Sequence, residues 1–176
     1  VRRAMEHGLV AAGAFSTSVA QMAVANSLGL FCHRTSTEAN LSTVVMSDSS
    51  SGYADRLSGD VDEVDAEAVA QEALDKALRG RNPQSLEPGE YEVVLEESAV
   101  SDVLDFLADL GFSALAVQEE RSFMAGRLGQ RVMGENVSIW DDGLASDSIP
   151  MPFDYEGVPK QRVDLIQHGV ARGVVY

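Results

Sequence analysis

The stretch YEVVLEESAVSDVLDFLADL (residues 91–110) changes its hydrophobic period from two to that of a helix. From residue 91 to 96, Tyr91, Val93 and Leu95 alternate with Glu92, Val94 and Glu96, which predicts a strand over Tyr91–Leu95 with one apolar face. Over Ser98–Leu110 the spacing predicts an amphipathic helix that ends at Gly111. Its apolar side comprises Val100, Val103, Leu104, Leu107 and Leu110, and its polar side carries Asp102, Asp105 and Asp109.

Beyond this helix the sequence favours short strands and turns. Phe112–Met124 is helical or irregular, and Val137–Asp141 predicts a short strand. Pro150–Pro159 is rich in turn residues. Arg162–Tyr176 predicts a hairpin bent around His168-Gly169. We therefore expect a strand-rich second domain.

The first part of the chain predicts an antiparallel sheet with flanking helices. Arg2–Ala12 has helical character, and Phe15–Ala25 has the alternation of a strand. Asn26–Gly29 supplies a hairpin turn, because Asn and Gly tolerate a left-handed backbone. Leu30–Thr35 and Glu38–Asp48 are expected as the second and third strands.

A helix and a linker close this first part. Ser47–Gly59 is expected to be a loop, and Asp62–Leu78 predicts the clearest helix of the chain, which Gly80 ends. Residues 81–89 resemble a linker because they contain two prolines and a glycine. The predicted fold class is therefore α+β, with an N-terminal domain over residues 1–83, a linker over 84–89 and a second, truncated domain over 90–176.

Composition excludes several classes of function. The formal net charge is -15, from 13 Lys and Arg against 28 Asp and Glu, so the protein repels nucleic-acid phosphates and anionic membranes. Gly8–Cys32 has no charged residue but is too polar to span a membrane. Cys32 is the single cysteine, which precludes an intramolecular disulfide and favours a reducing cytoplasm.

Few residues suggest a catalytic or metal site. Asp105 and Asp109 are four apart on one helix face and are weak candidates for a carboxylate metal site, which needs several converging oxygens. The three histidines, His7, His33 and His168, are far apart in sequence. The acidic clusters Asp141-Asp142 and Asp154/Glu156 fit turn formation better than catalysis.

The succession of local motifs resembles the TldD/PmbA family, the modulators of DNA gyrase and zinc-dependent peptidases. The matching segments, in order, are Asn26–Phe31, Pro88–Leu95, Gly126–Val132, Trp140–Gly143, Phe153–Arg162, which holds the loop Asp154, Glu156 and Gly157, and Leu165–Val170. The resemblance implies that the chain is a central portion of a longer protein.

The resemblance also implies a branch within that family. In the zinc-bearing TldD branch a His-Glu-x-x-x-His motif lies on the helix after the Val-Val-Leu strand, whereas the helix here, Ser98–Leu110, contains no histidine. This points to the PmbA-like or TldE-like branch, a subunit with no zinc ligands or catalytic residues assigned in this chain. The expected partners are a zinc-bearing TldD-like subunit, further copies of the chain, or both, acting on peptides.

Two alternatives stay open at this stage. The chain could belong to a peptidase in its own right, with a site completed by residues outside it. It could instead be an acidic interaction module that binds a basic partner, and such binding would weaken at raised salt.

Overall fold

The computed structural model describes residues 1–145 and 148–176. The chain forms two compact units, Val1–Tyr91 and Glu92–Ala145 with Pro150–Tyr176. Each unit has its own core and its own antiparallel sheet, so the predicted α+β class is confirmed. Among the described residues no helix is both long and apolar enough to cross a bilayer.

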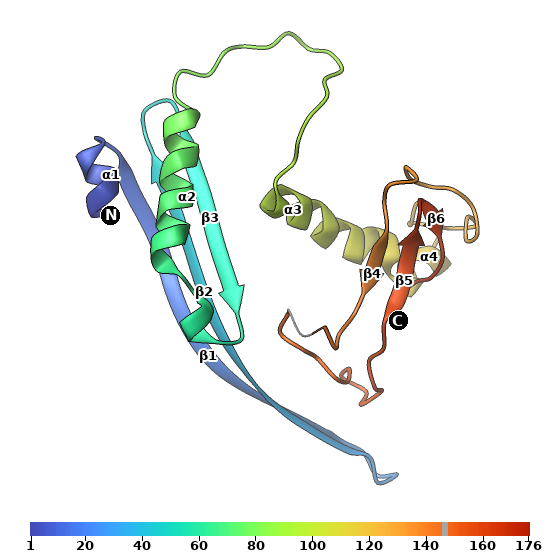
Figure 1. The fold of residues 1–176 in the computed structure, drawn as a ribbon. Helices are drawn as coiled ribbons and strands as arrows, with labels where there is room; N and C mark the ends of the chain where they lie inside the picture. Colours follow the sequence, from blue (N-terminus) through green and yellow to red (C-terminus); the bar gives the residue numbers. More distant parts are fainter. Residues whose placement is uncertain (146–147) are drawn as a thin grey trace. The chain divides into compact units, whose positions relative to one another are not determined.

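The first unit is a three-stranded antiparallel sheet with helices against it (Figure 1). A short helix α1 (Arg2–Glu6) precedes the strands β1 (Val10–Ala25), β2 (Phe31–Met46) and β3 (Ser51–Ser58), which lie in the order β1-β2-β3. A 3-10 turn η1 (Val61–Glu63) leads to helix α2 (Ala66–Arg79).

Helix α2 packs on β2 and β3 and forms the core of this unit. Val69, Ala73, Leu74 and Ala77 of the helix are buried together with Val45 and Ala54 of the sheet. The Asp65 side chain begins the helix by accepting hydrogen bonds from the N–H groups of Glu67 and Ala68, each at 3.0 Å. The predicted helix is therefore present, beginning four residues later than expected.

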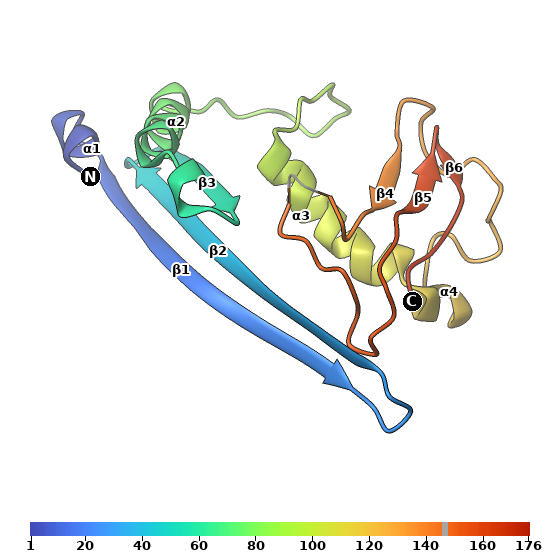
Figure 2. The same cartoon turned by 60° about the horizontal axis from the view of Figure 1, so that its bottom comes forward.

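The strands β1 and β2 form a hairpin that extends well beyond β3 (Figure 2). Strand β3 pairs only with Ala39–Met46, so Ser18–Ala25 and Phe31–Glu38 continue as a two-stranded ribbon, called the arm below. At its tip the Asn26 side chain accepts hydrogen bonds from the N–H groups of Leu28 and Leu30, and Gly29 has a φ of 93°. The predicted hairpin turn is confirmed.

Three predictions in this unit were wrong. The first helix ends at Glu6 instead of Ala12, because Gly8 takes a φ of 68° and starts the change to strand. The two strands expected over residues 30–35 and 38–48 are one continuous strand, β2. The loop expected over residues 47–59 contains β3, whose strand conformation is stabilised by pairing with β2 and by the contact with α2.

The second unit begins with helical turns and ends in a small sheet. Helix α3 (Glu97–Leu107) continues into a π-helical turn η2 (Ala108–Phe112) and helix α4 (Ala114–Gln118). Strands β4 (Ile139–Asp141), β5 (Val163–Gln167) and β6 (Val170–Ala171) pair antiparallel in that order. The buried core consists of Phe112, Met124, Leu165, Ile166 and Ala171.

The predicted hairpin at the end of the chain is confirmed. His168 and Gly169 both have positive φ angles, 48° and 76°, as a two-residue hairpin turn requires. A side chain at Gly169 would lie 2.4 Å from the carbonyl oxygen of Met133, so the turn is also packed closely against the preceding loop.

The most informative stretch of the sequence folds differently from its prediction. Tyr91–Leu95 is irregular rather than a strand, and Val94 is 95% exposed. No strand pairs with it among the described residues, and apolar alternation alone cannot hold a strand in water. Helix α3 is present, but its residues Val100 and Val103 are exposed, as is Leu110 in the following turn η2. Of the predicted apolar face only Leu104 and Leu107 are half-buried.

Candidate functional site

A hollow of about 330 Å³ opens in the second unit between the end of α3 and the small sheet. Leu104, Asp105 and Ala108 border it from the helical side. Trp140 and Asp141 of β4 contribute another wall. The remaining lining residues are Phe112, Ile139, Lys160, Leu165, Val175 and Tyr176.

The hollow combines an apolar floor with three charged groups. Phe112 and Leu165 belong to the buried core, whereas Asp105, Asp141 and Lys160 supply two carboxylates and one ammonium group. Pockets that bind small molecules or peptide ends typically have this composition, with few polar groups on an apolar surface. The volume lies at the small end of the range for such pockets.

The two predicted carboxylates are separated by this arrangement. Asp105 lines the hollow, whereas Asp109 lies in the π-helical turn and does not line it. The helix presents Asp105 to the same hollow as Asp141, a residue that belongs to one of the acidic clusters noted in the sequence. The pair that faces the hollow is therefore Asp105 and Asp141.

Residues around Trp140 hold one wall in place. The Arg162 guanidinium lies over the Trp140 ring, 4.4 Å from its centroid, in a cation–π contact. The same guanidinium forms an ion pair with Asp164 at 3.3 Å. These contacts hold the Trp140 indole in the wall of the hollow.

The loop with Asp154, Glu156 and Gly157 is a turn built around one carboxylate. The Asp154 side chain accepts hydrogen bonds from the N–H groups of Glu156 and Val158, both at 2.9 Å. Gly157 has a φ of 83°, which favours glycine there. These contacts account for the spacing of Asp154, Glu156 and Gly157 by local geometry.

Hydrogen bonding also alters the acidity of Asp154. The Val158 N–H lowers the pKa of the Asp154 carboxyl below its ordinary value of 3.8. The Glu156 and Gly157 N–H groups and the positive charge of Lys160 act in the same direction, while partial desolvation opposes them. Lys160 thus acts on the charge of this turn and also lines the hollow.

The donor set of the hollow does not fit a zinc ion. Zinc sites in proteins use three or four ligands drawn from histidine, cysteine and carboxylates. The hollow offers two carboxylates together with a lysine, and the described residues contain no group of three or more such ligands. We therefore assign no metal-dependent step to the residues of this chain.

Several lining residues were not assigned a role from the sequence. Trp140 and Lys160 lie within quoted motifs, and Tyr176 within the terminal hairpin, but no spacing relates them to Asp105. They converge only because β4 pairs with β5 next to the helical turns. Lys160 is the only lysine in the second half of the sequence, and this is the one signal that could have suggested a functional role for it.

Solved structures share this fold. A candidate modulator of DNA gyrase from Thermotoga maritima matches with a TM-score of 0.85 and 24% identity, covering 92% of this chain and 38% of that one. A second candidate gyrase modulator, from Bacteroides thetaiotaomicron, matches with a TM-score of 0.83 and 20% identity over 94% and 39% of the two chains. TldE from Thermococcus kodakarensis matches with a TM-score of 0.75 and 24% identity over 99% and 41%.

The sequence matches two consecutive domains of one protein family. Residues 3–81 match the PmbA/TldA metallopeptidase central domain, and residues 88–176 match the C-terminal domain of the same metallopeptidases. The chain is therefore of the class of proteins in which these two metallopeptidase domains follow one another. The chain belongs to the PmbA/TldD family.

A curated relative supports the same alignment. An uncharacterized protein of Methanocaldococcus jannaschii is 28% identical over 171 residues, which cover 97% of this chain and 40% of that protein. The chain thus spans about 40% of the length of the relatives it matches.

Proposed function

We propose that this chain is part of a TldE-like subunit that holds peptides and works with a zinc-bearing TldD-like partner, in the cytoplasm. The observation that carries the proposal is the hollow beside α3. There Asp105 stands on the helix on which the TldD branch has its His-Glu-x-x-x-His motif, and Lys160 and Trp140 complete the lining.

The chemistry of the hollow suits binding rather than bond cleavage. Its carboxylates can accept hydrogen bonds from a peptide ammonium or amide, and Lys160 can pair with a carboxylate. Trp140 adds an apolar and aromatic surface for a side chain. This set can orient an extended peptide for a catalytic group supplied by another subunit.

Exposed apolar residues support a role in association. Phe106 on α3 is 71% exposed and Leu110 in the following turn η2 is 55% exposed, in a protein that is otherwise strongly acidic. Large exposed apolar surfaces commonly mark sites of protein contact. We infer that α3 faces another part of the assembly, with a TldD-like chain as the proposed partner.

Substitutions in the hollow test this function in the assembled complex. With the complete gene product and a TldD-like partner, Lys160→Gln should raise the KM for a peptide substrate by about fivefold to tenfold and change kcat little. The reason is that Lys160 is assigned to peptide binding and takes no part in the chemical step. Initial rates over a range of peptide concentrations give both constants.

A matched pair of variants on one helical segment provides the control. Asp105→Asn should weaken peptide binding, whereas Asp109→Asn, which removes the same charge outside the hollow, should leave it unchanged. Equal effects of these two substitutions would contradict a role for the hollow. A loss confined to kcat in Lys160→Gln would also contradict it.

A further inference from the structure

Along the arm, one edge of β2 has no strand beside it among the residues that the structure describes. Leu30, just before β2, accepts a hydrogen bond from the Asn26 N–H and so points its carbonyl toward β1. Ser47, just after β2, donates its N–H to the Ser50 carbonyl and so points toward β3. Backbone groups of successive strand residues point to opposite neighbours, and the register of both pairs is unbroken. Odd-numbered residues of β2 therefore direct their N–H and C=O groups toward the β3 side.

Four residues of β2 consequently offer backbone groups beyond the end of β3. These residues are Phe31, His33, Thr35 and Thr37. Strand β3 ends at Ser58, opposite Ala39, and the chain then turns away through Gly59 into η1. An open strand edge of this length can pair with an added strand.

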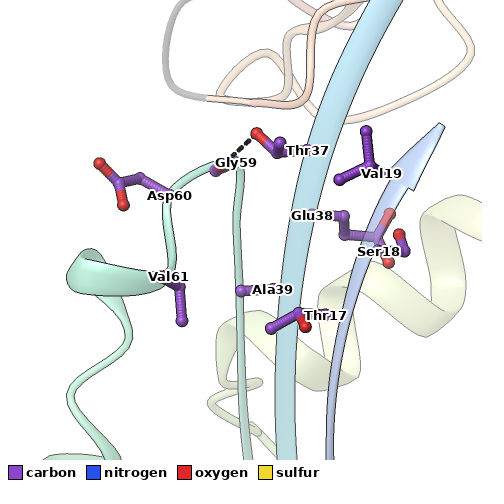
Figure 3. Close-up of a pocket in the computed structure, with 9 residues that line it drawn as sticks. All are labelled: Thr17, Ser18, Val19, Thr37, Glu38, Ala39, Gly59, Asp60 and Val61. Atoms are coloured by element: carbon purple, nitrogen blue, oxygen red, sulfur yellow. Dashed lines mark hydrogen bonds between the residues drawn. The ribbon is translucent and has the colours of Figure 1, made fainter. Parts of the chain in front are cut away.

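A hollow of about 460 Å³ lies where β3 ends (Figure 3). Its walls are Thr17–Val19 of β1, Thr37–Ala39 of β2 and Gly59–Val61 after β3. The Thr37 hydroxyl donates a hydrogen bond to the Gly59 carbonyl at 2.7 Å, which fixes the point where the chain leaves the sheet. A strand laid along the open edge would begin in this hollow.

Charged residues near this edge differ between its two ends. Glu38 and Asp60 line the hollow, and Glu38 has no ion pair with any residue that the structure describes. The Asp60 side chain accepts a hydrogen bond from the Asp62 N–H. Asp60 is also exposed, so its negative charge faces solvent. Arg34 lies on β2 nearer the tip of the arm. The open edge is therefore negative where β3 ends and carries a positive residue toward the tip.

We propose that the open edge of β2 over Phe31–Thr37 binds an extended peptide antiparallel to β2, with positive charge at its amino end. This orientation continues the line of β3 and places the peptide α-amino group near Glu38 and Asp60. The parallel orientation would bring the terminal carboxylate to the same two acids. The inference rests on the peptide-holding role proposed above and assigns a second holding surface to it.

The test is peptide binding to the complete gene product in the absence of any partner chain, by fluorescence anisotropy. The probe is Lys-Lys-Thr-Val-Thr-Val-Thr with a free amino end and a fluorescein label at the carboxyl end. Thr35→Pro should weaken binding by about tenfold, because proline removes an N–H from the open edge. The double variant Glu38→Gln with Asp60→Asn should weaken it by about fivefold without altering the edge.

A matched proline serves as the control. Gln21 lies opposite Thr35 in the register, and its N–H points to the outer edge of β1, so Gln21→Pro should bind the probe as the unmodified protein does. A peptide of the same composition with both lysines at the carboxyl end should bind about fivefold more weakly.

Three results would overturn the proposal: equal loss in Gln21→Pro and Thr35→Pro, unchanged binding in the Glu38/Asp60 double variant, or equal binding of the two peptides. Circular dichroism of each variant confirms the fold, and the double variant tests the site even where a proline variant is unfolded. Because no partner is present, failure to form a TldD-like complex would leave this measurement unaffected.

Discussion

At the scale of single residues, Asp154 shows how a conspicuous acidic motif can be structural. Its carboxylate closes a turn through the N–H groups of Val158 and Glu156, and these bonds favour the ionised form. The pKa is lower in the folded than in the unfolded chain, so ionised Asp154 contributes stability above the unfolded value. That contribution is lost as the pH falls through the folded pKa.

We therefore predict that Asp154→Ala lowers the melting temperature at pH 7, and that its difference from the unmodified protein shrinks as the pH falls below about 4. Thermal unfolding followed by circular dichroism between pH 7 and pH 3 measures this. Asp154→Asn keeps a side-chain oxygen acceptor and should retain part of the stability. A deficit in Asp154→Ala that stays constant over this range would contradict the assignment.

At the scale of elements, periodicity identified the helices and hairpin turns but not the pairing of strands. The turn at Asn26–Gly29 and helix α2 depend on local residues, and both were found where the sequence suggested. Whether residues 51–58 and 91–95 form strands depends on whether another strand lies beside them. The short-range pattern of the sequence does not encode such pairing.

The candidate site was predictable only in part for the same reason. Asp105 could be selected from the polar face of its helix, but its neighbours Asp141 and Lys160 are brought to it by the packing of β4 and the loop before β5. Asp141 and Lys160 both lie more than 30 residues after Asp105 in the sequence. No periodic pattern relates residues so far apart, so the sequence does not indicate that they form one site.

The contact between α2 and β3 makes a further prediction at this scale. A side chain at Gly52 would lie 2.1 Å from the Ala73 carbonyl oxygen and 2.5 Å from the Ala77 nitrogen, both backbone atoms that cannot move independently. Gly52→Ala should therefore destabilise the protein by about 2–3 kcal/mol, measured by urea unfolding.

The control is Gly59→Ala at the other end of β3. There the nearest atom outside its chain neighbours, the Thr37 carbonyl oxygen, lies at 3.7 Å, an ordinary contact. This substitution should change stability by less than about 0.5 kcal/mol. Equal destabilisation by the two substitutions would show that close approach of α2 is not what requires glycine at residue 52.

At the scale of the whole molecule, the chain combines two domains of one family with surfaces that we propose bind peptide and a partner. The central and C-terminal domains of the PmbA/TldD family are both present, and helix α3 in the second of them carries Asp102 and Asp105 and no histidine. Exposed apolar residues on that helix and an open strand edge on the arm offer surfaces for a partner and for peptide.

Reconstitution of peptide cleavage from purified complete gene products tests whether this protein needs a TldD-like partner for catalysis. We predict that this protein alone neither cleaves an unstructured peptide nor binds stoichiometric zinc. We also predict that cleavage appears when a TldD-like chain is added and is lost on chelation. Stoichiometric zinc binding and chelator-sensitive cleavage by this protein alone would contradict the account.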